Sequence, residues 1–332
     1  MRTIRPSALK EELKANALAR IPSMMHGAPG EGKSEIAYQV AEDLNSKLFE
    51  IRANLFDPVD VRGGLKVVEQ EDGTYRTRYG VPEDYPDSNY QGAVTILIDE
   101  LTTAPKATQN SLLQLLTTGK IGTYTCPPNT TFIAAGNRST DRAAVHEMPT
   151  PVKNRFSHFV LESNIDDWIA WAVNNDIDET LISFLRFRPQ LLSQVDATQN
   201  AFPTPRAWAY VNRKLPFMHD EFYGVASLVG DAAAGEFAAF KSIYQDLPDI
   251  DDVIANPTTA KVPTSTSVIF AVIGALTVRV TKENFASIVK YANRLPTEYG
   301  VLVMKDALAK DRTLVQSQTF TDWSVKNADV LL

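Results

Sequence analysis

A glycine-rich segment near the start of the chain has the residue types and spacing needed to bind the phosphates of a nucleotide. The sequence Gly27-Ala-Pro-Gly-Glu-Gly-Lys-Ser34 matches the Walker A pattern G-x-x-x-x-G-K-[ST] at every defined position. The glycines let backbone N–H groups turn toward phosphate oxygens, and the positive end of the following helix favours an anion. Lys33 would reach the β- and γ-phosphates, and Ser34 would place its hydroxyl on Mg²⁺. We therefore expect ATP and Mg²⁺ as cofactors, with the nucleotide bound by Gly27, Ala28, Pro29, Gly30, Glu31, Gly32, Lys33, Ser34 and the next residue, Glu35.

Two acidic residues end the apolar run Val94-Thr-Ile-Leu-Ile-Asp-Glu100. Such a run is typical of a parallel strand buried on both faces, and ligands bind beyond the carboxyl ends of these strands. Asp99 is expected to bind the nucleotide's Mg²⁺ together with Ser34, and Glu100 is expected to polarise the attacking water as the catalytic base. By itself the run could equally end in a surface turn. Its position after a complete phosphate-loop motif favours the catalytic interpretation.

Three further polar residues give weaker signals. Asn137 follows the strand-like run at 131–136, so it could hydrogen-bond the γ-phosphate or the water, although an Asn after Gly is usually part of a turn. Arg155 is expected in the last turn of a short helix capped by Thr150, where its charge suits the helix dipole and fits a structural role. Arg206 is expected at the second position of a helix, where a cation opposes the dipole. A phosphate partner would explain why an arginine stands there. The dipole effect is below about 1 kcal/mol, so this argument cannot stand by itself.

The first half of the chain alternates strand-like and helix-like segments, which indicates an α/β domain with a parallel sheet. The expected strands are 22–26, 48–53, 94–98 and 131–135, and the expected helices are 33–45 and 106–116. Two hairpins are also expected, one at 67–78 with its turn at Asp72-Gly73 and one at 122–132 around Pro127-Pro128-Asn129.

From about Asp166 the strand-like runs stop and amphipathic helical segments dominate. The expected helices are 165–174, 179–186, 206–215, 221–231, 236–247, 267–279, 282–295 and 297–310. We therefore expect three domains: an α/β nucleotide-binding core at 1–163, an all-α lid at 164–248 and a helical C-terminal extension at 249–332.

The composition indicates which kinds of partner and which cellular compartment to expect. The chain has 332 residues, a net charge of −7 and a single cysteine, Cys126, which is expected to be buried and fits a reducing compartment. A negative net charge disfavours non-specific binding to nucleic acid, and no apolar stretch is long enough to span a membrane. The N-terminal residues lack the apolar core of a signal peptide, so we expect a cytoplasmic protein. The histidines lack metal-ligand spacing, so no metal beyond Mg²⁺ is expected; they are His26, His146, His158 and His219.

Taken in order, these motifs resemble those of AAA+ ATPases, and within that group the MoxR-like branch. The resemblance covers about residues 20–215 and includes Asn-Arg-Phe at 154–156 and Pro-Arg-Ala at 205–207. The strongest local similarity is Asp99-Glu-Leu-Thr-Thr-Ala-Pro-Lys-Ala-Thr-Gln-Asn-Ser-Leu-Leu-Gln114. Asp57-Pro-Val-Asp-Val-Arg-Gly-Gly64 resembles the segment that leads into this branch's insert in the second helix.

The resemblance implies roles that spacing alone does not give. Asn137 would be sensor 1, Arg155 would be the arginine finger that reaches the neighbouring subunit's γ-phosphate, and Arg206 would be sensor 2 on the helical lid. A finger that acts between subunits implies a ring, usually a hexamer. The sequence departs from the family after Asn137, because Arg138 stands where proline is common. Arg138 or Arg142 could therefore compete with Arg155 for the finger role.

The resemblance also implies an ATP-driven machine that remodels a protein client or adaptor, and it suggests a von Willebrand factor A domain protein as partner. One alternative is a nucleic-acid motor or loader of the same superfamily, which the net charge disfavours. Another is a scaffold that binds ATP without turnover, which the presence of both Asp99 and Glu100 disfavours.

Overall fold

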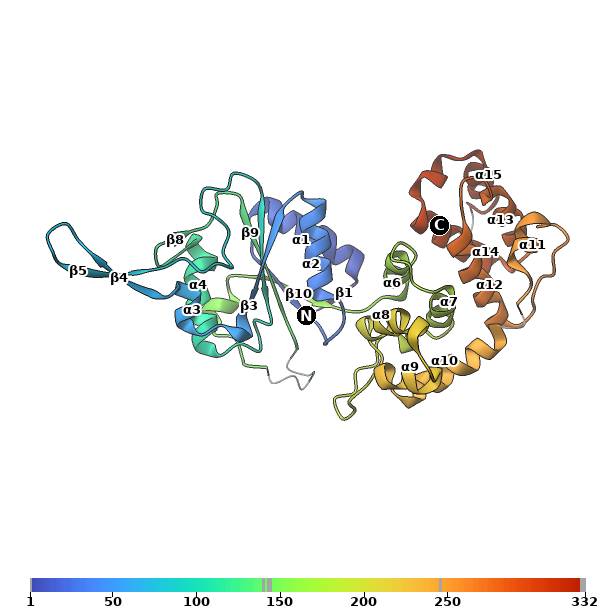
Figure 1. Ribbon diagram of the computed structural model, residues 1–332. Helices are drawn as coiled ribbons and strands as arrows, with labels where there is room; N and C mark the ends of the chain where they lie inside the picture. The colour runs from blue at the N-terminus through green and yellow to red at the C-terminus, as the bar shows by residue number, and fades with distance from the viewer. Residues whose placement is uncertain (1, 139–140, 142–144, 245–246, 329–332) are drawn as a thin grey trace. The chain divides into compact units, whose positions relative to one another are not determined.

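The computed structural model describes residues 2–138, 141, 145–244 and 247–328. The chain divides into two compact units, Met1–Ser163 and Asn164–Leu332. The first unit is built from strands and helices and the second from helices, as the colours of Figure 1 allow the reader to follow. The predicted fold class, a parallel sheet flanked by helices and followed by a helical region, is confirmed.

A six-stranded sheet forms the centre of the first unit. Its strand order is β1-β10-β2-β9-β6-β3, and every neighbouring pair is parallel. Because the strands are parallel, their carboxyl ends lie at one edge, where the ends of β2, β9 and β6 are adjacent. All four strands predicted from the sequence belong to this sheet. The strands are β1 (Thr3–Ile4), β2 (Ser23–His26), β3 (Lys47–Arg52), β6 (Val94–Asp99), β9 (Thr130–Gly136) and β10 (Ser157–Leu161).

Helices cover both faces of this sheet. On one face, Met25 and Leu97 pack with apolar residues of α1 and α2, while on the other face Met24 and Ile96 pack with leucines of α4. Alternate residues of β6 therefore face opposite sides of the sheet, which explains why the strand is apolar on both sides apart from Thr95 and the terminal Asp99. The helices of this unit are α1 (Pro6–Ala19), α2 (Lys33–Asp43), α3 (Pro58–Arg62), α4 (Lys106–Thr118) and α5 (Thr150–Lys153).

Two β-hairpins accompany the sheet in the described part of this unit. Strands β4 (Leu65–Glu69) and β5 (Tyr75–Tyr79) form the first, which confirms the predicted hairpin; Gly73 has a φ of 77° in its turn, and the ribbon extends away from the sheet (Figure 1). The second consists of β7 (Lys120–Ile121) and β8 (Tyr124–Thr125), so the prediction of a hairpin at 122–132 is wrong. The prolines at 127–128 cannot donate hydrogen bonds to a ladder, and the residues after Asn129 belong to β9.

The second unit consists of α-helices joined by loops and short 3₁₀ segments. Its buried side chains form two hydrophobic clusters, one around Trp208 and Phe237 and the other around Leu276 and Tyr291. The division predicted at residue 248 stays a prediction. The helices are α6 (Ile165–Ala172), α7 (Glu179–Phe187), α8 (Pro205–Lys214), α9 (Glu221–Val229), α10 (Asp231–Tyr244), α11 (Ile250–Ala255), α12 (Thr266–Arg279), α13 (Phe285–Ala292), α14 (Thr297–Lys310) and α15 (Gln318–Lys326).

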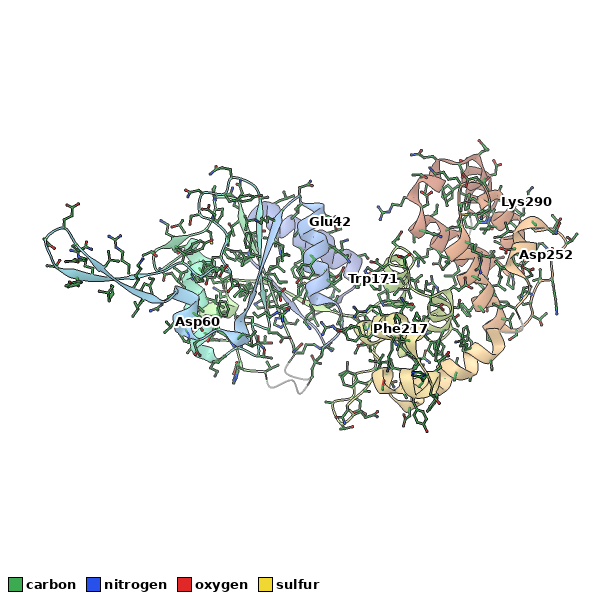
Figure 2. The ribbon with its side chains drawn as sticks, in the orientation of Figure 1. Glu42, Asp60, Trp171, Phe217, Asp252 and Lys290 are labelled. Atoms are coloured by element: carbon green, nitrogen blue, oxygen red, sulfur yellow. The ribbon has the colours of Figure 1, made fainter. Side chains whose placement is uncertain are left out.

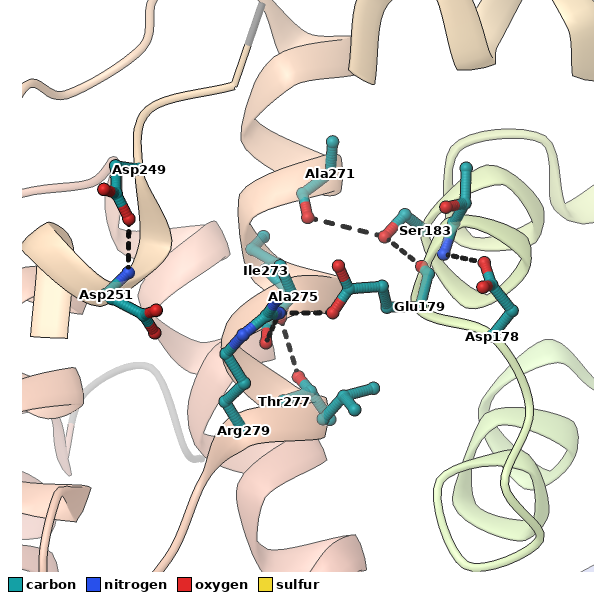
Figure 3. A network of polar contacts seen from close by, with 12 residues as sticks. Asp178, Glu179, Ser183, Asp249, Asp251, Ala271, Ile273, Ala275, Thr277 and Arg279 are labelled. Atoms are coloured by element: carbon teal, nitrogen blue, oxygen red, sulfur yellow. Dashed lines mark hydrogen bonds and ion pairs between the residues drawn. The ribbon is translucent and has the colours of Figure 1, made fainter. Parts of the chain in front are cut away.

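Helices α7 and α12 pack closely within this unit. Ser183 Oγ donates to Glu179 O at 2.6 Å and lies 3.4 Å from Ala271 O, as Figure 3 shows. Gly274 permits this approach, because a Cβ there would lie 1.9 Å from Ser183 Oγ. Arg279 adds an ion pair to Glu179 at the same contact (Figure 3).

Three of the four tryptophans lie in the core. Trp168, Trp208 and Trp323 are buried, whereas Trp171, labelled in Figure 2, is only partly buried. Cys126 is buried, as expected. No helix among the described residues has the length and apolar character needed to cross a membrane.

Candidate functional site

The glycine-rich motif joins strand β2, in the middle of the sheet, to helix α2. Gly30 and Gly32 have φ values of 79° and 86°, in the left-handed region that favours glycine. A Cβ at Gly27 would lie 2.7 Å from Glu31 Oε2, so a larger residue there would displace the Glu31 carboxylate. The sequence therefore folds into a tight loop at the start of α2, where the helix N-terminus favours a phosphate.

The two glutamates of this region have different surroundings. Glu31 Oε2 accepts a hydrogen bond from Ala28 N at 2.8 Å, and burial raises the pKa of the Glu31 carboxyl. Glu35 is exposed and accepts instead from Gln39 Nε2 at 2.9 Å. The structure thus joins Glu31 to the loop but does not join Glu35 to it, and a contact of Glu35 with the nucleotide stays a prediction.

The ammonium group of Lys33 is held inside the loop. Its Nζ donates to Gly27 O and Ala28 O, each at 2.9 Å, and to Asn137 Oδ1 at 3.1 Å. The side chain is buried, so these bonds replace water around the charge. A phosphate that enters the loop would have to take over some of these bonds.

Ser34 and Asp99 face each other across the end of the sheet. Ser34 Oγ donates to Asp99 Oδ2 at 2.6 Å, so the first turn of α2 meets the carboxyl end of β6. Hydroxyl and carboxylate oxygens are the hard ligands that Mg²⁺ prefers, and this pair fits such an ion with phosphate and water as further ligands. Within the described ranges, no group of three or more His, Cys, Asp or Glu forms a separate metal site.

Glu100 has an unusual backbone conformation for a residue other than glycine. Its φ is 55°, which costs on the order of 1–3 kcal/mol, and strain of this kind is enriched at functional sites. Glu100 Oε2 accepts from Thr103 Oγ1 at 3.2 Å and from Asn137 Nδ2 at 3.4 Å. The carboxylate is therefore held on the side of β9.

Asn137 lies between Lys33 and Glu100 because of the strand order. Strand β9 pairs with β2 on one side and with β6 on the other, so its carboxyl end lies between the phosphate loop and the acidic pair. Asn137 is buried, and Thr102 Oγ1 donates to its carbonyl oxygen at 3.1 Å. Thr102 and Thr103 were not predicted as part of the site; only their position two and three residues after Glu100 could have indicated it.

Arg155 lies outside helix α5 rather than in its last turn. The helix ends at Lys153, and its N-cap is Pro149, so both the predicted cap at Thr150 and the predicted place of Arg155 are wrong. A helix of four residues is too short to reach Arg155. The arginine is exposed, and its Nε donates to Thr117 Oγ1 at the end of α4, at 3.2 Å.

The other candidate arginines are in different environments. Arg138 Nε bonds to both carboxylate oxygens of Asp141, at 3.1 and 3.2 Å. Arg142 lies outside the described residues. Arg206 belongs to the second unit, where it follows Pro205 at the start of α8, and Thr204 Oγ1 caps that helix by accepting from Ala207 N at 3.0 Å. The role of Arg206 as sensor 2 stays a prediction.

Comparison with known proteins bears on the first unit. Residues 22–156 match the family model described as AAA domain (dynein-related subfamily). A solved structure of a Thermotoga maritima RuvB mutant is similar at 14% sequence identity and a TM-score of 0.41, over 81% of this chain and 80% of that chain. NtrX from Brucella abortus is similar at 14% identity and a TM-score of 0.36, over 95% of this chain and 64% of that chain. No curated protein matches the sequence.

The two structural similarities are too weak to distinguish between functions. The family match is more informative, because the matched residues include the phosphate loop, the Asp99–Glu100 pair and Asn137. The parallel sheet described above is the architecture that this family requires. Residues 22–156 therefore form an AAA domain with a P-loop fold, and the chain is an ATP hydrolase of that domain class.

Proposed function

We propose that this chain is a MoxR-like AAA+ ATPase that assembles into a ring, usually a hexamer in this group, and uses ATP hydrolysis to remodel a protein client. The observation that carries the proposal is the environment of Arg155. Its side chain is exposed and donates to a neutral hydroxyl, and no carboxylate in the described ranges forms an ion pair with it. An arginine with no carboxylate partner among the described residues of its own chain is suited to a phosphate on a neighbouring subunit.

Arg138 is less suited to that role. Its guanidinium pairs with Asp141 of the same chain through both carboxylate oxygens, and this pair would have to break before the arginine could reach another subunit. The assignment of Arg155 as the finger therefore rests on the difference in pairing between these two arginines.

The arrangement supports a division of labour during hydrolysis. The loop and Lys33 would bind the phosphates, and Ser34 and Asp99 would hold Mg²⁺, which offsets the phosphate charge. Glu100 would take the proton of the attacking water, and Asn137 would orient that water beside the γ-phosphate. Arg155 of a neighbour would stabilise the charge that develops, and Arg206 would sense the nucleotide from the second unit.

Mixed assembly tests the shared site. Arg155→Ala subunits lack the finger, and Lys33→Ala subunits cannot bind ATP productively, so each should be inactive alone. A mixture should regain activity, because a Lys33→Ala subunit can offer its intact Arg155 to an Arg155→Ala neighbour. Arg20→Ala, at an exposed arginine of the same unit, is the matched control and should be active alone. Absence of recovery at every ratio, with mixed assembly confirmed by light scattering, would contradict a finger that acts between subunits.

The client requires a separate experiment. Glu100→Gln should bind ATP without turnover and hold the client, so affinity capture with this variant in ATP should enrich a defined protein over the same capture in ADP. A captured protein with a von Willebrand factor A domain would support the suggested partner. ATPase stimulation by DNA with a steep salt dependence would instead identify a nucleic-acid motor and overturn the proposal.

A further inference from the structure

Two histidines that lie far apart in the sequence form a pair beside the phosphate loop. His26 Nε2 and His158 Nδ1 lie 3.0 Å apart, and the two rings stack with centroids 5.3 Å apart and an angle of 16°. The pair arises from strand register: His26 on β2 pairs with Val160 on β10, so His158 is its diagonal neighbour on the same face. No local pattern predicts this contact, because the two positions belong to separate strands.

The direction of the hydrogen bonds follows from the third member of the chain. His158 Nε2 lies 2.8 Å from Lys153 O, and a carbonyl oxygen can only accept, so Nε2 carries the proton. In neutral His158, Nδ1 is then the acceptor, and the donor must be the N–H of His26 Nε2. The bonds therefore run in one direction, from His26 to His158 to the backbone of Lys153.

This row of hydrogen bonds begins beside the phosphate loop and ends beside the segment that carries Arg155, the two parts of the proposed shared site. His26 directly precedes Gly27, the first residue of the phosphate loop. Lys153 is the last residue of α5, two positions before Arg155. Phe156, which follows Arg155, is buried and packs edge-on against the His158 ring, with centroids 6.1 Å apart. The ring of His158 thus contacts the backbone before the arginine and the side chain after it.

We infer that His26 and His158 are positioning residues that link the phosphate loop of a subunit to the arginine that the same subunit offers to its neighbour. A shift of the loop on nucleotide binding or release would move His26, and the hydrogen bonds would pass that shift to the segment of Arg155. The inference rests on the proposed role of Arg155 between subunits. It adds a route by which the nucleotide bound to one subunit controls the rate of ATP hydrolysis in the next subunit.

The alternative is a histidine pair that only fills the core. The two interpretations differ in which nucleotide site a substitution of His158 impairs, the neighbouring subunit's or its own. If His158 works through Arg155, the His158→Ala subunit keeps its own nucleotide site and loses only the arginine that it offers. If His158 works on its own loop or on general packing, the subunit's own site fails.

Mixed assembly separates these cases. His158→Ala alone should lose ATPase activity by about tenfold or more in kcat, with ATP affinity within about twofold of the wild type. Mixing it with Lys33→Ala subunits should restore activity, as with Arg155→Ala, because the Lys33→Ala subunits carry an intact pair and an intact arginine. His158→Gln, which keeps a donor near the position of Nε2, should retain more activity than His158→Ala. His219→Ala, at an exposed histidine of the second unit, is the control and should behave as the wild type.

Each outcome decides between the interpretations. Recovery with both Arg155→Ala and His158→Ala supports the inference. Recovery with Arg155→Ala but not with His158→Ala overturns the inference and leaves the proposed function standing. Recovery with neither overturns the shared arginine and the inference with it. Full activity of His158→Ala alone would also overturn the inference. If His158→Ala has a lowered melting temperature, the mixing experiment is repeated with His158→Gln. Recovery of activity in its mixture with Lys33→Ala supports the inference, and absence of recovery overturns it.

Discussion

Asn137 joins Lys33 to Glu100 through opposite ends of one amide. Its Oδ1 accepts from Lys33 Nζ at 3.1 Å, and its Nδ2 donates to Glu100 Oε2 at 3.4 Å. The orientation of the amide is chemically consistent, since the oxygen faces a cation and the nitrogen faces a carboxylate. A triphosphate that draws Lys33 away from the loop carbonyls would also change the position of Asn137. Phosphate binding and the expected base are therefore coupled through this side chain.

Replacement of Asn137 by Asp should separate binding from turnover. The new carboxylate keeps the size of the side chain and an acceptor for Lys33, but it removes the donor to Glu100 and adds a like charge beside it. We expect kcat to fall by about 10- to 100-fold while ATP affinity changes by less than about threefold. Steady-state kinetics and fluorescent-nucleotide titration measure the two quantities. Asn89→Asp, on the exposed surface, is the control, and equal losses in kcat and affinity would contradict this role.

Removal of the Ser34 hydroxyl should change the dependence on Mg²⁺. Ser34→Ala eliminates the oxygen that lies 2.6 Å from Asp99 Oδ2, so one expected ligand of the ion is lost. We expect the Mg²⁺ concentration for half-maximal ATPase activity to rise by about tenfold, with partial recovery of rate at saturating Mg²⁺. Ser111→Ala, on the exposed surface of α4, should leave the Mg²⁺ titration unchanged. An unchanged titration for Ser34→Ala would remove Ser34 from the ion's ligands.

The parts of the site that could be predicted are those whose signal is local. The phosphate loop needs a strand, tight glycine turns and a helix in direct succession, and all three appear in one stretch of sequence. Strand β6 has apolar residues on both of its faces because helices cover both faces of the sheet. Its acidic end is therefore visible in the sequence as a break in an apolar run. These features depend on neighbouring residues rather than on distant contacts.

The parts that could not be predicted depend on pairing between distant segments. Strand β1 has two residues and β10 begins with Ser-His, so neither carries a strong periodic signal; each forms by joining a sheet that already exists. The contact between His26 and His158 depends on the register of β10 against β2, which no local pattern fixes. The short α5 ends before Arg155 because the chain turns there into β10, so a helix predicted from its Thr-Pro start was too long.

Two glycines offer a matched test of the phosphate loop. Gly27→Ala would place a Cβ 2.7 Å from Glu31 Oε2 and 3.3 Å from Leu161 Cβ, so the Glu31 carboxylate would have to move away and its hydrogen bond to Ala28 N would be lost. Gly235→Ala, in helix α10, meets no atom within 4 Å and should stabilise its helix by about 0.5–1 kcal/mol. We expect Gly27→Ala to weaken ATP binding by about tenfold or more, whereas Gly235→Ala binds normally. Calorimetric titration and thermal unfolding compare them, and normal ATP binding by Gly27→Ala would show that the loop tolerates the added carbon.

The histidine pair should make stability sensitive to acid. Burial, followed by the charges of His158 and Lys33, lowers the pKa of His26 from 6.5 to about 4. Between these two values the unfolded chain binds a proton that the folded chain does not, so the free energy of unfolding falls as the pH falls from about 6.5 to 4. The loss attributable to His26 should be about 2 kcal/mol, below the full effect of the shift because the ring is partly exposed. His26→Gln keeps a donor to His158 but cannot titrate, so its urea-unfolding free energy should depend less steeply on pH. His219→Gln should follow the wild-type curve; the same curve for His26→Gln would show that His26 does not contribute to the loss.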